Sequence, residues 1–458
     1  MHVVAIGGSD AGISAALRAR ELDPDCAFTV VVADAFPNFS ICGIPYYVSG
    51  EVGDWQALAH RSHADLEATG MSLRLDTRVT AIEPAEHRIL TAGGGAIGYD
   101  ALIVGTGAVP VRPPIAGLDR LGPADGVHLL HSIGDTFELM ETLGREPMRR
   151  AVIVGAGYIG IEMAEGLRLR GLEVTQVEQL GEVLPTVDPE LGAVVREELV
   201  RNGVDVHCGT RVEAVASGEG DAGRAIVRAV DAEGQALSFP ADVVLVVVGV
   251  RPDVALAAAA GARLGARGAI AVDREMRTTL PDVFAAGDCV VTHHRLLGES
   301  YLPLGTTAHK QGRVAGENAL GGSREFAGSL GTQVVKVFDL VAARTGLRDD
   351  EAVAAGFDPL TVAARPDDHK AYYPGARPIA MRLTGDRRGG RLLGVQLVGH
   401  RGSEVAKRID IPATAIFNEM TADAFADLDL SYTPPLGSPW EAVQMGVQEL
   451  VRGLDAAA

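Results

Sequence analysis

Two glycine-rich turns constrain the fold of this chain more than any other feature. In each case a short apolar run that resembles a strand leads into the turn, and a helical pattern follows it. The glycines are Gly7, Gly8 and Gly12 in the first turn and Gly155, Gly157 and Gly160 in the second. A strand, turn and helix of this kind exposes backbone N–H groups that bind a pyrophosphate. The two copies predict two Rossmann-like, dinucleotide-binding folds, although Ser9 replaces the middle glycine of the first motif.

Acidic residues follow the second strand of each unit at the spacing of a ribose-binding carboxylate. Asp34 comes 22 residues after Gly12, and Glu178 comes 18 residues after Gly160. Such a carboxylate accepts a hydrogen bond from a ribose hydroxyl and repels a 2′-phosphate, so Glu178 favours NADH, with NADPH as the alternative. Because a nicotinamide needs an acceptor for its hydride, the first unit is predicted to bind FAD. An ordinary βαβ unit without a ligand is the alternative for that first unit.

The rest of the chain divides into connectors and a different kind of domain. The strand-like runs 99–107 and 242–252 each carry a glycine turn and are expected to pass the chain between two domains. Asp288 follows an apolar strand, where it could bind a ribityl chain or cap a helix, and a helix is predicted over 306–320. Beyond residue 326, strand-like and helical segments alternate without a glycine fingerprint, which predicts an α+β domain. The predicted domains are 1–112 and 251–325 for FAD, 113–250 for NAD, and 326–458.

The four cysteines are Cys26, Cys42, Cys208 and Cys289, and no two lie within ten residues of each other. This spacing excludes a local CxxC pair and a zinc ribbon, and no metal site is predicted. Cys42 stands out because Gly43 and Pro45 follow it, and Pro45 suits the first turn of a helix. A helix N-terminus stabilises the thiolate that attacks sulfur. Cys42 is therefore the predicted nucleophile, and the other three are predicted to be small buried side chains.

Composition narrows the range of partners and compartments. The chain has 458 residues and a formal charge of -19, which disfavours nucleic acid and anionic membranes as partners. The sequence has no apolar stretch of the length of a membrane span and no signal-peptide pattern at its start. With few cysteines, it is expected to be a cytoplasmic protein.

The order of these motifs closely resembles the single-cysteine branch of the pyridine nucleotide-disulfide oxidoreductases. This branch contains coenzyme A disulfide and persulfide reductases, NADH oxidases and NADH peroxidases. The resemblance implies an α/β fold with two Rossmann-like domains, for FAD and NAD, and a C-terminal α+β dimerisation domain. The residues implied to bind FAD are Gly7, Gly8, Gly12, Asp34, Thr106, Gly107 and Asp288. Those implied to bind NADH are Gly155, Gly157, Gly160 and Glu178, with Tyr158 gating the nicotinamide pocket.

The resemblance also implies a homodimer in which the C-terminal domain completes the active site of the other subunit. Tyr432 and Tyr373 resemble two tyrosines that face the cysteine across the dimer, with Tyr372 as the alternative to Tyr373. A phenol there could stabilise or protonate a departing thiolate. The alternative is that each is an ordinary core or interface aromatic residue.

The predicted function is an FAD-dependent oxidoreductase that uses NAD(P)H to reduce a small-molecule disulfide or persulfide through Cys42. Coenzyme A is one candidate thiol, because cationic side chains near the active-site loop could meet its phosphates. Those side chains are Arg18, Arg20, His60, Arg61 and His63, and their alternative is an ordinary solvated surface. Two other functions stay open: an oxidase or peroxidase that cycles Cys42 through a sulfenate, and an electron-transfer or redox-sensing flavoprotein.

One position favours sulfur chemistry over oxygen chemistry. NADH oxidases and peroxidases tend to carry a histidine in the first glycine turn, whereas this chain has Asp10. A carboxylate would not stabilise an anionic sulfenate. His309 is expected near the flavin, and its role is left open.

Overall fold

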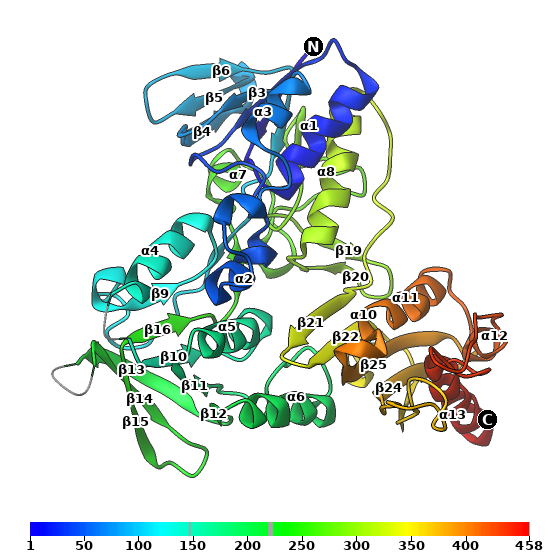
Figure 1. Ribbon diagram of the computed structural model, residues 1–458. Coiled ribbons are helices and arrows are strands. Elements are labelled where there is room, and N and C mark those ends of the chain that lie inside the picture. The colour runs from blue at the N-terminus through cyan, green and yellow to red at the C-terminus, as the bar shows by residue number, and fades with distance from the viewer. Residues whose placement is uncertain (146–147, 219–222, 458) are drawn as a thin grey trace.

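The computed structural model describes residues 1–145, 148–218 and 223–457, and they form three lobes (Figure 1). The first lobe is built on a parallel five-stranded sheet. Its strands, in spatial order, are β18 (Val283–Ala285), β7 (Ala101–Val104), β1 (His2–Ile6), β2 (Ala27–Val31) and β3 (Ser72–Arg74). Val3 of β1 lies opposite Phe28 of β2 and Ala101 of β7. The central strands are buried on both faces, which explains why they are apolar at successive positions.

Two helices of this lobe lie side by side, as Figure 1 shows: α1 (Asp10–Leu22) and α8 (Gly305–Ala319). Glycines allow their close approach, because a Cβ at Gly312 would lie 2.3 Å from the carbonyl oxygen of Ala11. A Cβ at Gly316 would lie 2.2 Å from the carbonyl oxygen of Ala15. The helix predicted over 306–320 is thus confirmed to within one residue, and it brings residues near 309 beside the start of α1.

The second lobe repeats the parallel arrangement. Its sheet contains β12 (Val204–His207), β11 (Glu173–Val177), β10 (Arg150–Val154), β16 (Val243–Val246) and β9 (Val127–Leu129), in that order. Its helices are α4 (Ile133–Leu143), α5 (Tyr158–Leu169) and α6 (Pro189–Arg201). Between β12 and β16 the chain forms a separate antiparallel sheet of β13 (Arg211–Ser217), β14 (Ala225–Val230) and β15 (Ala236–Ala241). Two Rossmann-like folds in one chain are therefore confirmed.

The chain enters and leaves the second lobe through two neighbouring strands. β8 (Ala108–Pro110) pairs antiparallel with β17 (Val250–Pro252), so Val250 lies opposite Pro110. β17 ends the segment 242–252 and β8 directly follows the segment 99–107, the two segments expected to pass the chain between domains. The exact domain limits at 112 and 250 stay a prediction.

The third lobe is an antiparallel sheet covered by helices. Its strand order is β21 (Gln333–Val337), β22 (Leu340–Gly346), β25 (Leu392–His400), β24 (Ala380–Asp386) and β23 (Pro359–Ala364). Its helices are α9 (Asp349–Ala354), α10 (Val405–Arg408), α11 (Asp410–Phe417), α12 (Ala422–Ala426) and α13 (Ala442–Ala457). The helical region over 401–418 is divided, because Glu404 adopts a left-handed conformation with φ 53° just before α10. The expected α+β character is confirmed.

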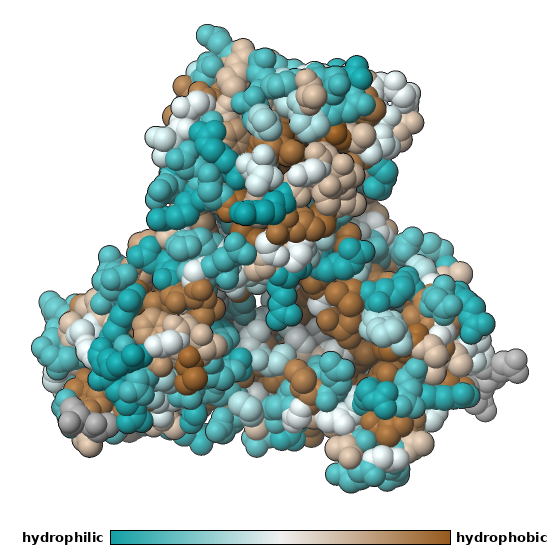
Figure 2. All heavy atoms as spheres, turned by 180° about the vertical axis from the view of Figure 1, so that it is seen from behind, coloured by the Kyte–Doolittle hydropathy of each residue, from teal (hydrophilic) through white to brown (hydrophobic). Residues whose placement is uncertain are grey.

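Side chains from different lobes hold the interfaces between them. Phe36 and Trp55 of the first lobe meet the ring of Phe137 on α4 of the second, with centroids 5.3 and 5.1 Å away. Lys336 on β21 of the third lobe forms an ion pair with Glu165 on α5. Figure 2, which views the molecule from behind, shows the surface hollowed between the upper lobe and the two lower ones.

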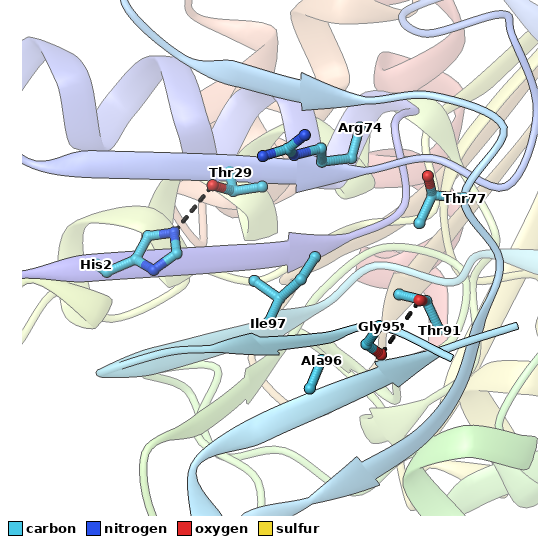
Figure 3. Close-up of a pocket in the computed structure, with 8 residues that line it drawn as sticks. All are labelled: His2, Thr29, Arg74, Thr77, Thr91, Gly95, Ala96 and Ile97. Atoms are coloured by element: carbon cyan, nitrogen blue, oxygen red, sulfur yellow. Dashed lines mark hydrogen bonds between the residues drawn. The ribbon is translucent and has the colours of Figure 1, made fainter. Parts of the chain in front are cut away.

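A smaller antiparallel sheet extends the first lobe and forms a pocket with it (Figure 3). Its strands are β4 (Val79–Glu83), β5 (Arg88–Thr91) and β6 (Ala96–Gly98). The pocket is lined from this sheet and from β1, β2 and β3, and His2 Nε2 lies 2.9 Å from Thr29 Oγ1 inside it. Its lining contains none of the predicted cofactor-binding residues. Among the described residues, no helix has the length and apolarity needed to cross a membrane.

Candidate active site

The first glycine turn holds the start of α1 tightly against the end of β1. Gly7 has φ 113°, and a Cβ there would lie 2.1 Å from the carbonyl oxygen of Gly105. A Cβ at Gly12 would lie 2.0 Å from the carbonyl oxygen of Gly7. Ser9 precedes the helix but makes no side-chain capping hydrogen bond. The first N–H groups of α1 therefore follow a tightly packed glycine turn and are not capped by the Ser9 side chain. Uncapped N–H groups at a helix start suit a phosphate.

The second glycine turn has the same construction and carries the predicted ribose carboxylate. Gly155 has φ 106°, and a Cβ at Gly160 would lie 2.2 Å from the carbonyl oxygen of Gly155. Glu178 directly follows β11 and is 7% exposed. Its carboxylate accepts hydrogen bonds from the backbone N–H of Ala156 at 2.7 Å and of Leu180 at 2.9 Å. These hydrogen bonds fix Glu178 beside the turn, the place expected for the predicted ribose-binding carboxylate.

The other predicted FAD residues lie at the carboxyl ends of the first-lobe strands, where cofactors bind in such sheets. Asp34 is exposed beyond β2, and its carboxylate accepts a hydrogen bond from the Phe36 N–H at 2.8 Å. Thr106 and Gly107 follow β7, and the Thr106 hydroxyl donates to the carbonyl of Asp253 at 2.5 Å. Asp288 lies just beyond β18. The alternative reading of Asp288 as a helix cap is wrong, because a turn follows it and α8 begins only at Gly305.

The predicted nucleophile lies in a short turn between β2 and α2. Cys42 is in the 3₁₀ turn Ile41–Gly43, and α2 (Ile44–Ser49) begins two residues later with Pro45 in its first turn. All four cysteines are free, and Cys42 is the exposed one. Cys26 and Cys289 are buried as expected, whereas Cys208 is half-buried.

The electrostatic surroundings of Cys42 differ from the prediction. The pKa of its thiol is raised, first by partial desolvation among the neighbouring atoms and then by nearby carboxylates. These carboxylates belong to Glu162, Asp10 and Asp288. The helix N-terminus was expected to stabilise the thiolate, and this is wrong for the chain by itself. Partial desolvation and three acidic groups outweigh the end of a helix of only six residues.

A carboxyl group that sequence analysis did not assign to the site lies next to the active-site helix. Glu162, on α5 of the second lobe, accepts a hydrogen bond from the Tyr46 hydroxyl at 3.3 Å. Burial raises the pKa of Glu162 to about 7, while the hydrogen bond from Tyr46 and the charge of Lys336 act in the opposite direction. The position of Glu162 two residues after Gly160 could have suggested a cofactor role, but its burial against Tyr46 required the structure.

The predicted tyrosines lie on the third lobe and face solvent in the single chain. Tyr432 is 44% exposed, Tyr373 is 43% exposed and Tyr372 is 73% exposed. Tyr372 shares a hydrogen bond with Tyr432, which raises the pKa of Tyr372. The ring of Tyr373 instead meets that of His369, with centroids 5.7 Å apart. Within the chain, Tyr372 is thus the hydrogen-bond partner of Tyr432. Burial raises the pKa of Tyr158, the predicted gate, to about 12.

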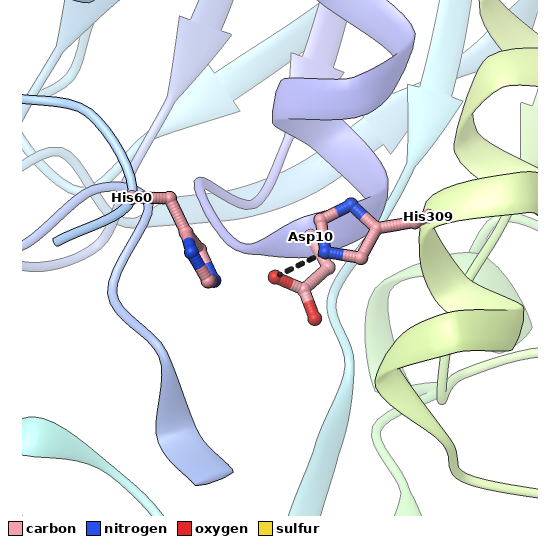
Figure 4. A group of neighbouring side chains, drawn as sticks. All are labelled: Asp10, His60 and His309. Carbon is pink, nitrogen blue, oxygen red and sulfur yellow. Dashed lines mark ion pairs between the residues drawn. The ribbon is translucent and has the colours of Figure 1, made fainter. Parts of the chain in front are cut away.

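Asp10 and His309, whose roles the sequence left open, come together with His60 (Figure 4). Asp10 Oδ1 lies 3.4 Å from His309 Nε2, and the His60 and His309 rings meet edge to face. Arg18 and Arg20, by contrast, are engaged within the first lobe. Arg18 pairs with Glu317, and Arg20 donates to the carbonyl groups of Thr69 and Cys26. These contacts support the alternative in which the two arginines do not bind phosphate.

The residues around the first glycine turn fit FAD. Asn38 is 2% exposed, its backbone N–H donates to the carbonyl of Gly8 at 2.7 Å, and its Nδ2 has no hydrogen-bond partner among the described residues. A buried donor of this kind, next to a turn with a free helix start, matches a ligand rich in acceptor oxygens. Asp288 is the residue predicted to bind the ribityl chain. Burial, followed by the charge of Asp10, raises its pKa to about 6.

Known proteins match the chain over nearly its full length. Residues 1–312 match the family model described as pyridine nucleotide-disulphide oxidoreductase, and residues 332–443 match the dimerisation domain of that family. A CoA-dependent NAD(P)H sulfur oxidoreductase of Pyrococcus furiosus is 34% identical over 443 residues, 96% of each chain. An NADH oxidase of Methanocaldococcus jannaschii is 31% identical over 461 residues, 99% of each chain. The solved structure of an NAD-dependent persulfide reductase from A. fulgidus has a TM-score of 0.92 and 38% identity, covering 100% of this chain and 84% of that one.

Proposed function

Because the chain belongs to the pyridine nucleotide-disulphide oxidoreductase family, we propose that it uses NADH to reduce a small-molecule disulfide or persulfide at Cys42. As a member of this family it is an FAD-dependent oxidoreductase that takes electrons from NADH or NADPH, and its C-terminal region is the dimerisation domain of a homodimer. The observation that carries the proposal is the isolation of Cys42. It is the exposed one of four free cysteines, so the second sulfur of any disulfide it forms must come from the substrate.

Cys42 acts in this mechanism as the nucleophile. Its thiolate attacks one sulfur of R–S–S–R′, the Cys42–S–R bond forms, the S–S bond breaks and R′S⁻ leaves and takes a proton. Two electrons and a second proton then cleave Cys42–S–R to give the Cys42 thiolate and RSH. When bound, FAD supplies the two-electron link between the nicotinamide and this sulfur. The sum is NADH, one proton and a disulfide going to NAD⁺ and two thiols.

The other residues bind, orient or supply protons. The N–H groups of the two glycine turns hold the pyrophosphates, Asp34 and Asp288 bind the hydroxyls of FAD, and Glu178 binds the ribose of NADH. Tyr432, with Tyr372 or Tyr373, would face the partner's Cys42 and protonate the departing thiolate. Their exposure in the single chain supports this role. We propose coenzyme A as the thiol, since the Pyrococcus furiosus relative is named as CoA-dependent. We propose the cytoplasm as the compartment, since the four cysteines are free.

The test is anaerobic. The FAD-loaded protein is reduced with one equivalent of NADH, and flavin absorbance is followed while coenzyme A disulfide, a coenzyme A persulfide or cystine is added. We expect reoxidation by at least one coenzyme A substrate, with its loss in Cys42→Ser and its retention in Cys208→Ser, because Cys208 lies outside the site. Full turnover with disulfide by the Cys42→Ser variant would contradict the mechanism.

An oxidase is the second candidate, because a relative at 31% identity is named an NADH oxidase. The same sample then receives air. Fast reoxidation in air, without any response to the sulfur substrates, would assign the protein to oxygen chemistry. The acidic side chains near Cys42 do not distinguish the two candidates, since they destabilise an anionic sulfenate and a thiolate alike.

A further inference from the structure

Three potential metal ligands that are far apart in the sequence converge beside the first glycine turn (Figure 4). Asp10 is the first residue of α1, His60 follows the short turn Trp55–Leu58, and His309 lies in the second turn of α8. One ligand atom from each lies within 4.8 Å of the other two. In the part of the chain that the structure describes, this is the one group of three or more such side chains. Two imidazoles and a carboxylate are ligands that zinc and related transition metals prefer.

The backbone and a neighbouring hydroxyl orient two of these ligands. The backbone N–H of His60 donates to the carbonyl of Asn38 at 3.0 Å. His309 Nδ1 lies 2.8 Å from the hydroxyl of Ser14, which is 8% exposed. When Nδ1–H donates to Ser14, the lone pair of Nε2 faces Asp10, which lies 3.4 Å away. Histidines that bind metals are held in this way, by a hydrogen bond from the other ring nitrogen.

One oxygen of the Asp10 carboxylate contacts His309 but has no hydrogen bond in the described part of the chain. Asp10 Oδ1 is buried and makes no hydrogen bond within the described residues. A buried oxygen without a hydrogen bond is costly, and a bound cation would remove that cost. Asp288 adds a second carboxyl group to the surroundings of Asp10. Among the described residues, Asp10 forms its ion pair with His309 and with no lysine or arginine.

We propose that Asp10, His60 and His309 form a binding site for one divalent transition-metal ion of the zinc type. Bonds of about 2.0–2.2 Å in tetrahedral geometry bring ligand atoms to about 3.4 Å from one another. The pair Asp10 and His309 already has that spacing. His60 is exposed, and its ligand atom already lies within 4.8 Å of the other two, so a rotamer adjustment of its ring closes the remaining distance. With three protein ligands, the fourth position of the ion stays open to water or to a small thiol.

The experiment measures metal content, so it does not depend on turnover. FAD-loaded protein is stripped with a chelator and dialysed to equilibrium against free Zn²⁺ buffered over a range of concentrations, and bound zinc and flavin are measured in each sample. The variants are Asp10→Asn, His60→Ala, His309→Ala and Ser14→Ala. The matched control is His87→Ala, because the His87 side chain is 45% exposed like that of His309 and lies 3.9 Å from Asp282, a pair without a third ligand. Cys42→Ser is included because a thiolate also binds zinc.

We expect one zinc ion per chain in the wild type and in the His87→Ala and Cys42→Ser variants. Each of the three ligand substitutions should weaken binding at least 10-fold, and Ser14→Ala should weaken it about 10-fold. His60→Ala is the decisive variant, because the His60 ring is exposed and the flavin measured in the same sample shows whether FAD is retained. Unchanged zinc binding in His60→Ala, or loss of binding in Cys42→Ser alone, would overturn the proposal. The absence of stoichiometric binding by the wild type would overturn it as well.

Discussion

The carboxyl group of Glu162 should make the stability of the protein depend on pH near neutrality. Its pKa in the folded chain is about 7, mainly because of burial, against 4.5 for the ordinary side chain. Between these two values the folded state holds a proton that the unfolded state has released, so the free energy of unfolding falls as pH rises. A difference of about 2.5 pKa units corresponds to about 3 kcal/mol. Glu162→Gln removes this titration while keeping a side chain that can accept the hydrogen bond from Tyr46.

The assay is urea unfolding of the FAD-loaded protein, followed by circular dichroism at several values from pH 4.5 to 8. We expect the E162Q variant to gain about 3 kcal/mol relative to the wild type between the two ends of this range, with the gain accumulating steadily from about pH 4.5 to 7. Glu173→Gln serves as the control, because Glu173 is exposed at the start of β11 and should show no such trend. A constant difference between E162Q and the wild type, or a gain toward low pH, would refute the reasoning about burial.

Three other predictions test the remaining parts of the site. Gly157→Ala should keep the thermal stability but raise the KM for NADH at least 10-fold, because space is open around a Cβ there until a pyrophosphate approaches. Gly160→Ala should lower the thermal stability, because its Cβ would lie 2.2 Å from the carbonyl oxygen of Gly155. Equal thermal stability of the two variants would contradict this prediction. Glu178→Ala should raise the ratio of kcat/KM for NADPH to that for NADH at least 10-fold, since it removes a carboxylate that repels a 2′-phosphate, and steady-state kinetics with both cofactors decides it. Tyr432→Phe should slow disulfide reduction without changing the rate of flavin reduction by NADH, and comparison with Tyr372→Phe and Tyr373→Phe in the same stopped-flow assay shows which second tyrosine assists.

The architecture was predictable from local patterns because it depends on glycines in the turns and on the residues at the ends of strands. The turn at Gly155 to Gly160 needs a left-handed glycine and a helix that approaches without a Cβ, and both requirements are visible in the spacing of the residues. The fully apolar runs before each turn predicted buried parallel strands for the same reason. Cys42 was identifiable from its glycine and proline neighbours, and its exposure agrees with that prediction.

The sequence could not show how residues that are distant along the chain act together on one side chain. The pKa of the Cys42 thiol depends on Glu162 and Asp288, which lie on other segments of the chain. Local reasoning considered only the adjacent helix and therefore predicted the wrong direction. The approach of His60 and His309 to Asp10 likewise depends on three separate elements, and no spacing in the sequence marks it.

The position of β18 in the first sheet has a consequence for synthesis on the ribosome. β18 pairs with β7, yet the chain between Val104 and Val283 contains the whole second lobe. At about 5–20 residues per second, translation of these roughly 180 residues takes on the order of 10–35 s. During that time the edge of β7 that will receive β18 stays open, and the face of α1 that will receive α8 is uncovered. The NAD lobe can therefore fold first, although the FAD lobe begins first, and binding of the flavin must wait until Asp288 and α8 have emerged.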